Sequence, residues 1–275
     1  MKNMMRLAKL ITASALGGLL MACTPSPVPS DTTGDGADTL TLPDMTATAD
    51  SIVVLQPDTV ATAVRATSDS DFVVLADVVP DIIQEIRYYT TYNFIGRRIP
   101  GYDEPVALLT RRAADSLKAV SDELVAKGYR LKVFDAYRPR KAVRYFVEWS
   151  RHPADTLMKR YFYPEVNKAN VFELGYVSPR SAHSLGATID LTLFSMETER
   201  EVDMGGTYDF FGEVSHQSYT RTLTPEQLGH RRLLRDAMLR HGFRPVPSEW
   251  WHYTLRNEPY PDRSFDFDVR TDFRQ

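Results

Sequence analysis

The residues best suited to chemistry lie in two short segments, one containing His183 and the other His252. Alternation after Gly186 indicates a strand in which every second side chain is apolar, so Asp190 faces the opposite, polar side with Thr188 and Thr192. His183 precedes this strand and can reach the same side. A histidine and an aspartate that meet at one point are natural ligands for zinc.

The second segment supplies a third ligand, His252, next to the carboxylate of Glu249. Zinc held by two histidines and one carboxylate keeps a fourth position for water, which is the arrangement of catalytic sites. Glu249 is then the candidate general base. Residues three apart do not share a face of a regular strand, so we expect Glu249 in an irregular approach to the strand carrying His252. The remaining histidines have no comparable neighbours and receive no role: His152, His216, His230 and His241.

Other chemistries lack their motifs. The single cysteine, Cys23, lies near the N-terminus. The fold is therefore not stabilised by a disulfide within the chain, and a cysteine nucleophile is excluded. The sequence contains no P-loop, dinucleotide fingerprint, G-x-S-x-G elbow or H-E-x-x-H helix.

The elements that must position these residues follow from hydrophobic spacing. Apolar residues from Ala113 to Leu124 recur at helical spacing, and this helix is expected to stop at Lys127-Gly128. Alternation then predicts a strand over 129–134, followed by an exit loop over 135–139 that contains Arg138.

Further elements are a helix over 140–150 and a second helix opened by the capping box Thr224-Pro225-Glu226-Gln227. Residues 187–193 and 250–255 have the composition of strands. Helices and strands mix without a regular βαβ rhythm. We therefore predict an α+β fold, a single domain with a small, mostly antiparallel sheet flanked by helices and the zinc site on the sheet.

The spacing Ser181-x-His183-x-x-Gly186-x-x-x-Asp190, together with Glu249-Trp-Trp-His252, resembles the signature of the D-Ala-D-Ala dipeptidases, the VanX-type zinc peptidases related to D,D-carboxypeptidases. Further matching motifs occur across almost the whole domain: 93–96, 135–139, 203–205, 258–261 and 265–267. Several separated motifs in the right order are far more specific than any one of them.

The resemblance implies one zinc ion per chain, bound by His183, Asp190 and His252, with Glu249 as general base and then acid. It also implies that Arg138 stabilises the developing oxyanion. By similarity, the substrate pocket is expected to be lined by Tyr88, Ser181 and Asp209, with Tyr89 as the alternative to Tyr88 and Asp209 facing the substrate's ammonium group. The expected substrate is a D,D-dipeptide that is hydrolysed to D-alanine during peptidoglycan metabolism in the cell envelope.

Two other functions compete with this interpretation. A D,D- or L,D-carboxypeptidase acting on longer muropeptides would use the same metal and base. A cell-wall binding lipoprotein without turnover would need neither Glu249 nor Arg138, and both are present. An active dipeptidase is therefore favoured.

The N-terminal region differs from the rest of the chain. Basic residues, an apolar run and Leu20-Met21-Ala22-Cys23 predict a lipoprotein signal peptide over 1–22, with Cys23 as the lipidated residue. Residues 23–70 are polar and predict a low-complexity tether, which leaves 71–275 as the dipeptidase domain.

This organisation predicts an exported protein, anchored to a membrane by lipid and facing the periplasm or the cell exterior. The net charge of −3, with both signs well mixed, argues against a nucleic-acid partner, and no protein partner is implied. An enzyme outside the cytoplasm has poor access to a cytoplasmic pool of D-Ala-D-Ala, so wall turnover or nutrient use is favoured over antibiotic resistance.

Overall fold

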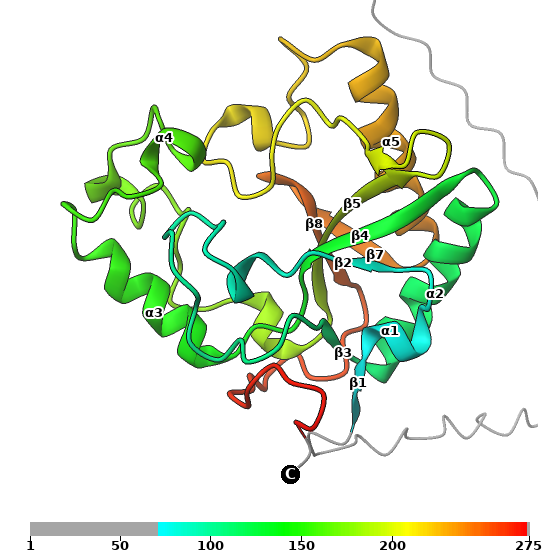
Figure 1. Ribbon diagram of the computed structural model, residues 1–275, viewed down its shortest axis with the longest axis horizontal. Coiled ribbons are helices and arrows are strands. Elements are labelled where there is room, and N and C mark those ends of the chain that lie inside the picture. The colour runs from blue at the N-terminus through cyan, green and yellow to red at the C-terminus, as the bar shows by residue number, and fades with distance from the viewer. Residues whose placement is uncertain (1–70, 274–275) are drawn as a thin grey trace, which may run out of the picture. The chain divides into compact units, whose positions relative to one another are not determined.

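A computed structural model describes residues 71–273 (Figure 1). The expected signal peptide, the lipidated Cys23 and the tether through residue 70 lie outside the described residues, so they stay predictions. In the described part of the chain, no helix is both long enough and apolar enough to cross a membrane.

The centre of the domain is a mixed sheet of six strands in which β2 and β4 are parallel and the other pairs are antiparallel. The strand order is β2-β4-β5-β8-β7, and β6 pairs with β5 beyond this path. The strands comprise β2 (Ile83–Gln84), β4 (Tyr129–Asp135), β5 (Thr188–Ser195), β6 (Arg200–Glu201), β7 (Phe243–Val246) and β8 (Glu249–Leu255). The prediction of a small, mostly antiparallel sheet is confirmed.

A separate antiparallel ribbon was not foreseen from the sequence. It pairs β1 (Phe72–Val74) with β3 (Leu108–Thr110), and both strands are largely buried. Three-residue strands are too short to show a reliable period, so their pairing depends on the fold around them.

Helices flank the sheet (Figure 1). α2 (Arg111–Val125) and α5 (Pro225–Arg240) lie on one side, and α3 (Arg140–Ser150) and the short α4 (Lys159–Phe162) lie on the other. The remaining helical segments are short: α1 (Leu75–Val78), η2 (Arg87–Tyr89), η3 (Lys168–Asn170), η4 (Ala182–Leu185) and η5 (Glu213–Ser215).

Local sequence signals set the ends of the long helices. The backbone turns left-handed at Gly128, with φ of 85°, directly after the α2 segment, as the Lys127-Gly128 signal predicts. At the start of α5, Thr224 and Gln227 form both reciprocal hydrogen bonds of a capping box. Both helices therefore begin or end where the sequence indicates.

The central strand β5 departs from the simple alternation expected from the sequence. Its apolar residues face the core, but Thr188 and Thr192 on the other face are also fully buried. The hydroxyl groups of Thr188 and Thr254 lie 2.9 Å apart and hydrogen-bond across to β8. The face carrying Asp190 is thus polar and buried rather than solvated.

Candidate metal and active site

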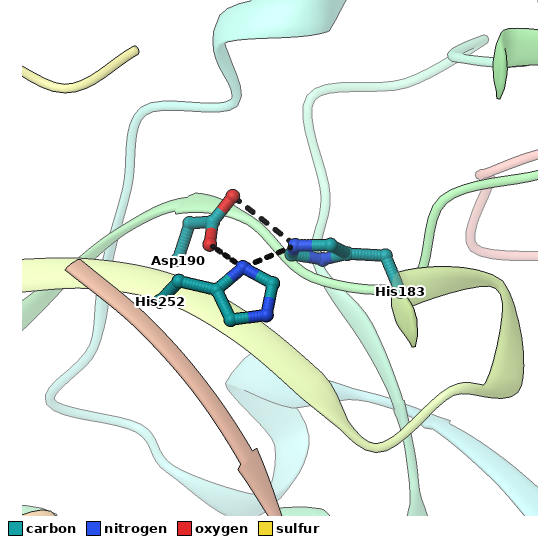
Figure 2. A group of neighbouring side chains, drawn as sticks. All are labelled: His183, Asp190 and His252. Carbon is teal, nitrogen blue, oxygen red and sulfur yellow. Dashed lines mark hydrogen bonds and ion pairs between the residues drawn. The ribbon is translucent and has the colours of Figure 1, made fainter. Parts of the chain in front are cut away.

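Three elements bring the expected ligands to one point (Figure 2). Asp190 of β5 lies directly opposite His252 of β8 in the antiparallel ladder, and His183 comes from η4 before β5. Opposed residues of a ladder have neighbouring side chains on one face. This register therefore converts a separation of 62 residues between Asp190 and His252 into direct contact.

The geometry is compact. Oδ2 of Asp190 lies 3.3 Å from Nε2 of His183, and Oδ1 lies 3.1 Å from Nδ1 of His252. The two imidazole nitrogens are 3.3 Å apart, and one ligand atom from each of the three residues lies within 4.8 Å of the others. Two imidazole nitrogens and one carboxylate oxygen form the donor set of a catalytic zinc site.

The orientation of His183 suits a metal ligand. Its Nδ1 lies 2.7 Å from the carbonyl oxygen of Ala136 and donates to it, so Nε2 keeps its lone pair for the centre of the site. Gly186, with φ of 84°, ends the helical turn that holds His183 and lets the chain enter β5. The Ser181-to-Asp190 motif thus has a structural reason for its glycine.

The electrostatic environment favours a cation at this point. Burial opposes the charged form of His252, but its contacts with Asp190 and Glu249 outweigh this and raise its pKa to about 10. Burial likewise opposes ionisation of Asp190, and its contacts with His183 and His252 outweigh this and lower its pKa well below the usual range. Oδ1 of Asp190 is buried without a hydrogen bond among the described residues. A site that retains a proton so strongly also suits a metal cation.

Glu249 reaches this group through an irregularity in the β7–β8 ladder. Pro245 pairs with Tyr253, but the next residue, Val246, pairs with Glu249, so β8 contains extra residues at this point. Oε2 of Glu249 lies 3.3 Å from Nδ1 of His252. The irregularity expected near Glu249 is present, and it places two residues three apart on the same side.

Arg138 follows the end of β4 by three residues and is partly buried, with 13% of its side chain exposed, beside the expected ligand Asp190. Its Nε donates to Oδ2 of Asp135 at 2.9 Å, and Nη2 lies 3.7 Å from Oδ2 of Asp190. The guanidinium group also packs over the rings of Tyr88 and Phe146. These contacts hold the charge in place before any ligand arrives, as an oxyanion partner requires.

The expected pocket residues line one cavity of about 550 Å³ together with the His-Asp-His group. Tyr88, Ser181 and Asp209 are all in its wall. The hydroxyl group of Tyr88 donates to Oδ2 of Asp209 at 2.8 Å. Tyr89 instead packs under Arg98 and is not part of the cavity lining, so of the two candidates only Tyr88 lines the cavity.

Asp209 has two unusual properties. Its backbone is left-handed, with φ of 60°, a conformation that costs energy for any residue with a Cβ and that often accompanies function. Burial, followed by the nearby charge of Asp190, raises the pKa of its carboxyl group well above the ordinary value. Asp209 therefore suits a positively charged ligand group that would favour its ionised form.

Two contributors to the site were missed from the sequence. The buried hydroxyl group of Tyr208 donates to Oδ2 of Asp190 at 3.2 Å, and its ring stacks on Phe134. Asp135 accepts from Tyr102 at 2.6 Å in addition to Arg138. Asp135 was visible as part of the 135–139 motif, but no local signal identifies Tyr208.

The four histidines without an assigned role lie in different surroundings, one at the cavity and three away from it. His216 lies in the cavity wall. The other three contact groups elsewhere: His152 contacts Glu148, His230 contacts the carbonyl group of Asp203, and His241 contacts Glu123.

Comparison with known proteins agrees with this geometry. A family model described as D-ala-D-ala dipeptidase, Peptidase M15, matches residues 68–270. The chain is 37% identical over 199 residues to a D-alanyl-D-alanine dipeptidase of Enterococcus faecium, covering 72% of this chain and 98% of the relative. A Streptomyces coelicolor relative of that name has the same identity and coverages. The Escherichia coli relative of that name is 31% identical over 186 residues, 68% of this chain and 85% of the relative.

Proposed function

This chain belongs to the D-Ala-D-Ala dipeptidase family of M15 peptidases, and from that premise we propose that it hydrolyses D-Ala-D-Ala with a zinc ion bound by His183, Asp190 and His252. The observation that carries the proposal is the buried His-Asp-His group beside Glu249 and Arg138. One clustered ligand set with an adjacent carboxylate and guanidinium group provides every part that peptide hydrolysis needs.

The donor set suits zinc because both imidazoles and the carboxylate present free donor atoms to a common point. A zinc ion would supply Lewis acidity at the scissile carbonyl and make water a competent nucleophile near neutral pH. The hydrogen bond from His183 to Ala136 and the one from Tyr208 to Asp190 would hold two of the ligands in their binding orientation.

Glu249 is the general base in this proposal. Its carboxylate takes one proton from the attacking water as the oxygen bonds to the scissile carbon, and it then delivers that proton to the leaving amine as the C–N bond breaks. The products are two molecules of D-alanine. Arg138 stabilises the negative charge that develops on the carbonyl oxygen, which favours the transition state over the bound substrate.

Asp209 and Tyr88 bind the amino end of the substrate. The ammonium group of the substrate would place a positive charge beside the Asp209 carboxyl group and so favour its ionised form. The Tyr88 hydroxyl group donates a hydrogen bond to the same carboxylate. A substrate extended at its amino end has no ammonium group at this position. The pair therefore favours a free dipeptide over a longer peptide with the same C-terminus.

The decisive experiment measures release of D-alanine from D-Ala-D-Ala and from a pentapeptide that ends in D-Ala-D-Ala. The metal content of the protein is determined, zinc is removed with a chelator and then restored, and a Glu249→Ala variant serves as the control. We expect dipeptide hydrolysis that requires zinc and is lost in the variant. Cleavage of the pentapeptide would indicate a carboxypeptidase, and metal binding without turnover would indicate a binding protein.

The proposal also places the enzyme outside the cytoplasm, anchored by a lipid on Cys23, where it would serve wall turnover or use of D-alanine. The order of charge, apolar run and cysteine over residues 1–23 supports this location. Expression with a labelled fatty acid tests it, with Cys23→Ser as the control. We expect the label and the membrane fraction to be lost together in the variant, and recovery of the unaltered protein in the cytoplasmic fraction would contradict the proposal.

A further inference from the structure

The two charges of the dipeptide need partners of opposite sign at the two ends of the cavity. Asp209, which is partly buried, provides the partner for the ammonium group. The C-terminal carboxylate has no partner in the mechanism above. Its partner must be a cation or a group of hydrogen-bond donors in the same cavity wall.

The cavity lining contains two arginines, Arg138 and Arg180. Arg138 already has partners, because its partly buried guanidinium group donates to Asp135 and lies beside Asp190. Arg180 differs in both respects. It is exposed, and its guanidinium group makes no hydrogen bond or ion pair with any described residue.

Arg180 lies on an exposed part of the cavity wall. It belongs to the largely exposed segment 174–181, which forms one wall of the cavity, and it directly precedes Ser181. Tyr88, which is buried, and Arg138 and Asp209, which are partly buried, line the same cavity. A dipeptide with its ammonium group at Asp209 extends by roughly 7 Å for two residues, which directs its carboxylate toward the exposed wall.

From this arrangement we propose that Arg180 binds the C-terminal carboxylate of the substrate and makes the site specific for peptides with a free carboxyl group. A guanidinium group matches a carboxylate with two parallel hydrogen bonds, and it remains charged throughout the working range of an enzyme. The inference rests on the proposed function, since it assumes the dipeptide orientation set by Asp209. A dipeptide whose carboxylate is blocked loses this partner.

The test compares D-Ala-D-Ala with its C-terminal amide, D-alanyl-D-alaninamide, in the zinc-loaded enzyme. We expect the unaltered enzyme to prefer the carboxylate substrate in kcat/KM by about tenfold or more, mainly through KM. Arg180→Gln should remove this preference, whereas Arg180→Lys should retain part of it. Arg112→Gln, on the exposed face of α2, is the matched control and should leave the preference unchanged.

A binding measurement separates this inference from the proposed function. Calorimetry of the zinc-loaded Glu249→Gln variant, with and without Arg180→Gln, gives the affinities for both ligands independently of turnover. Tighter binding of the carboxylate ligand that depends on Arg180 supports the inference even if no hydrolysis occurs, in which case only the proposed function fails. The inference about Arg180 is overturned if both ligands bind equally, if Arg180→Gln weakens the binding of both by the same factor, or if neither ligand binds.

Discussion

The hydroxyl group of Tyr88 donates a 2.8 Å hydrogen bond to Oδ2 of Asp209, which lies 121 residues further along the chain. Both residues are in the wall of the cavity, and the pKa of the Asp209 carboxyl group is raised well above its usual value by burial and by the charge of Asp190. The free protein therefore contains, in the cavity wall, a partly buried carboxyl group whose ionised form is disfavoured until a cation binds beside it. Such a group lowers the stability of the folded protein and favours the binding of a cationic ligand group.

Asp209→Asn should make the metal-free protein more stable at neutral pH. The folded-state pKa lies above the unfolded value of 3.8, so the contribution of Asp209 to stability is fully present below that value and is lost as pH rises through the folded pKa. Asparagine does not ionise and still accepts from Tyr88. We expect the unfolding midpoint to rise by about 3 °C at pH 8 and to change little at pH 4.

Thermal unfolding at both pH values checks this prediction, with the exposed Asp262→Asn as the control. The same Asp209→Asn variant should bind D-Ala-D-Ala at least about tenfold more weakly, because a neutral amide is a poor partner for ammonium. A variant that is less stable at pH 8 than the unaltered protein would contradict this account of Asp209.

Tyr208→Phe should weaken zinc binding by about tenfold while the fold is kept. The variant removes only the hydroxyl group that holds Asp190 at 3.2 Å, and the ring still stacks on Phe134. Titration against a competing chelator measures the affinity. Tyr163→Phe is a matched control, since that buried hydroxyl group has no hydrogen-bond partner among the described residues. Equal zinc affinity in Tyr208→Phe and the unaltered protein would exclude this role.

Arg138→Lys should lower kcat for D-Ala-D-Ala by roughly 100-fold and change KM by less than about threefold. Arginine can donate to Asp135 through Nε and still present its other N–H groups to the carbonyl oxygen of the substrate. Lysine keeps the positive charge but has a single nitrogen and cannot do both in the same geometry. Steady-state kinetics measure both parameters, and Arg140→Lys at the exposed start of α3 serves as the control. A raised KM with unchanged kcat would instead assign Arg138 to ground-state binding.

Gly186→Ala should destabilise the protein by at least about 2 kcal/mol. Gly186 has φ of 84°, and an added Cβ would collide with the ring of Phe72 and lie 3.1 Å from Cγ2 of Thr110. Phe72 cannot move easily, since its ring packs edge-on against three aromatic rings. Urea unfolding measures the loss. Gly229→Ala within α5 has open space around the new Cβ and should be neutral or stabilising.

Much of this fold could be predicted from the sequence, because several of its signals are local. The end of α2 shortly before Gly128 and the capping box at Thr224 depend on neighbouring residues alone. The short ribbon of β1 and β3 was not predictable, since three-residue strands gain their stability from tertiary packing. Burial of Thr188 and Thr192 was not predictable either, because alternation along a strand shows a polar face but not whether other elements cover it.

The sequence by itself determined the candidate residues, because spacing within His183-to-Asp190 and Glu249-to-His252 and the resemblance to a family are properties of the chain. The tertiary structure decided how they meet. The register of β5 against β8, the irregularity near Glu249 and the choice of Tyr88 over Tyr89 all depend on contacts between distant segments. The hydrogen bond from Tyr208 to Asp190 and the place of Arg180 in the cavity wall are likewise set by the tertiary structure, since local spacing does not indicate either of them.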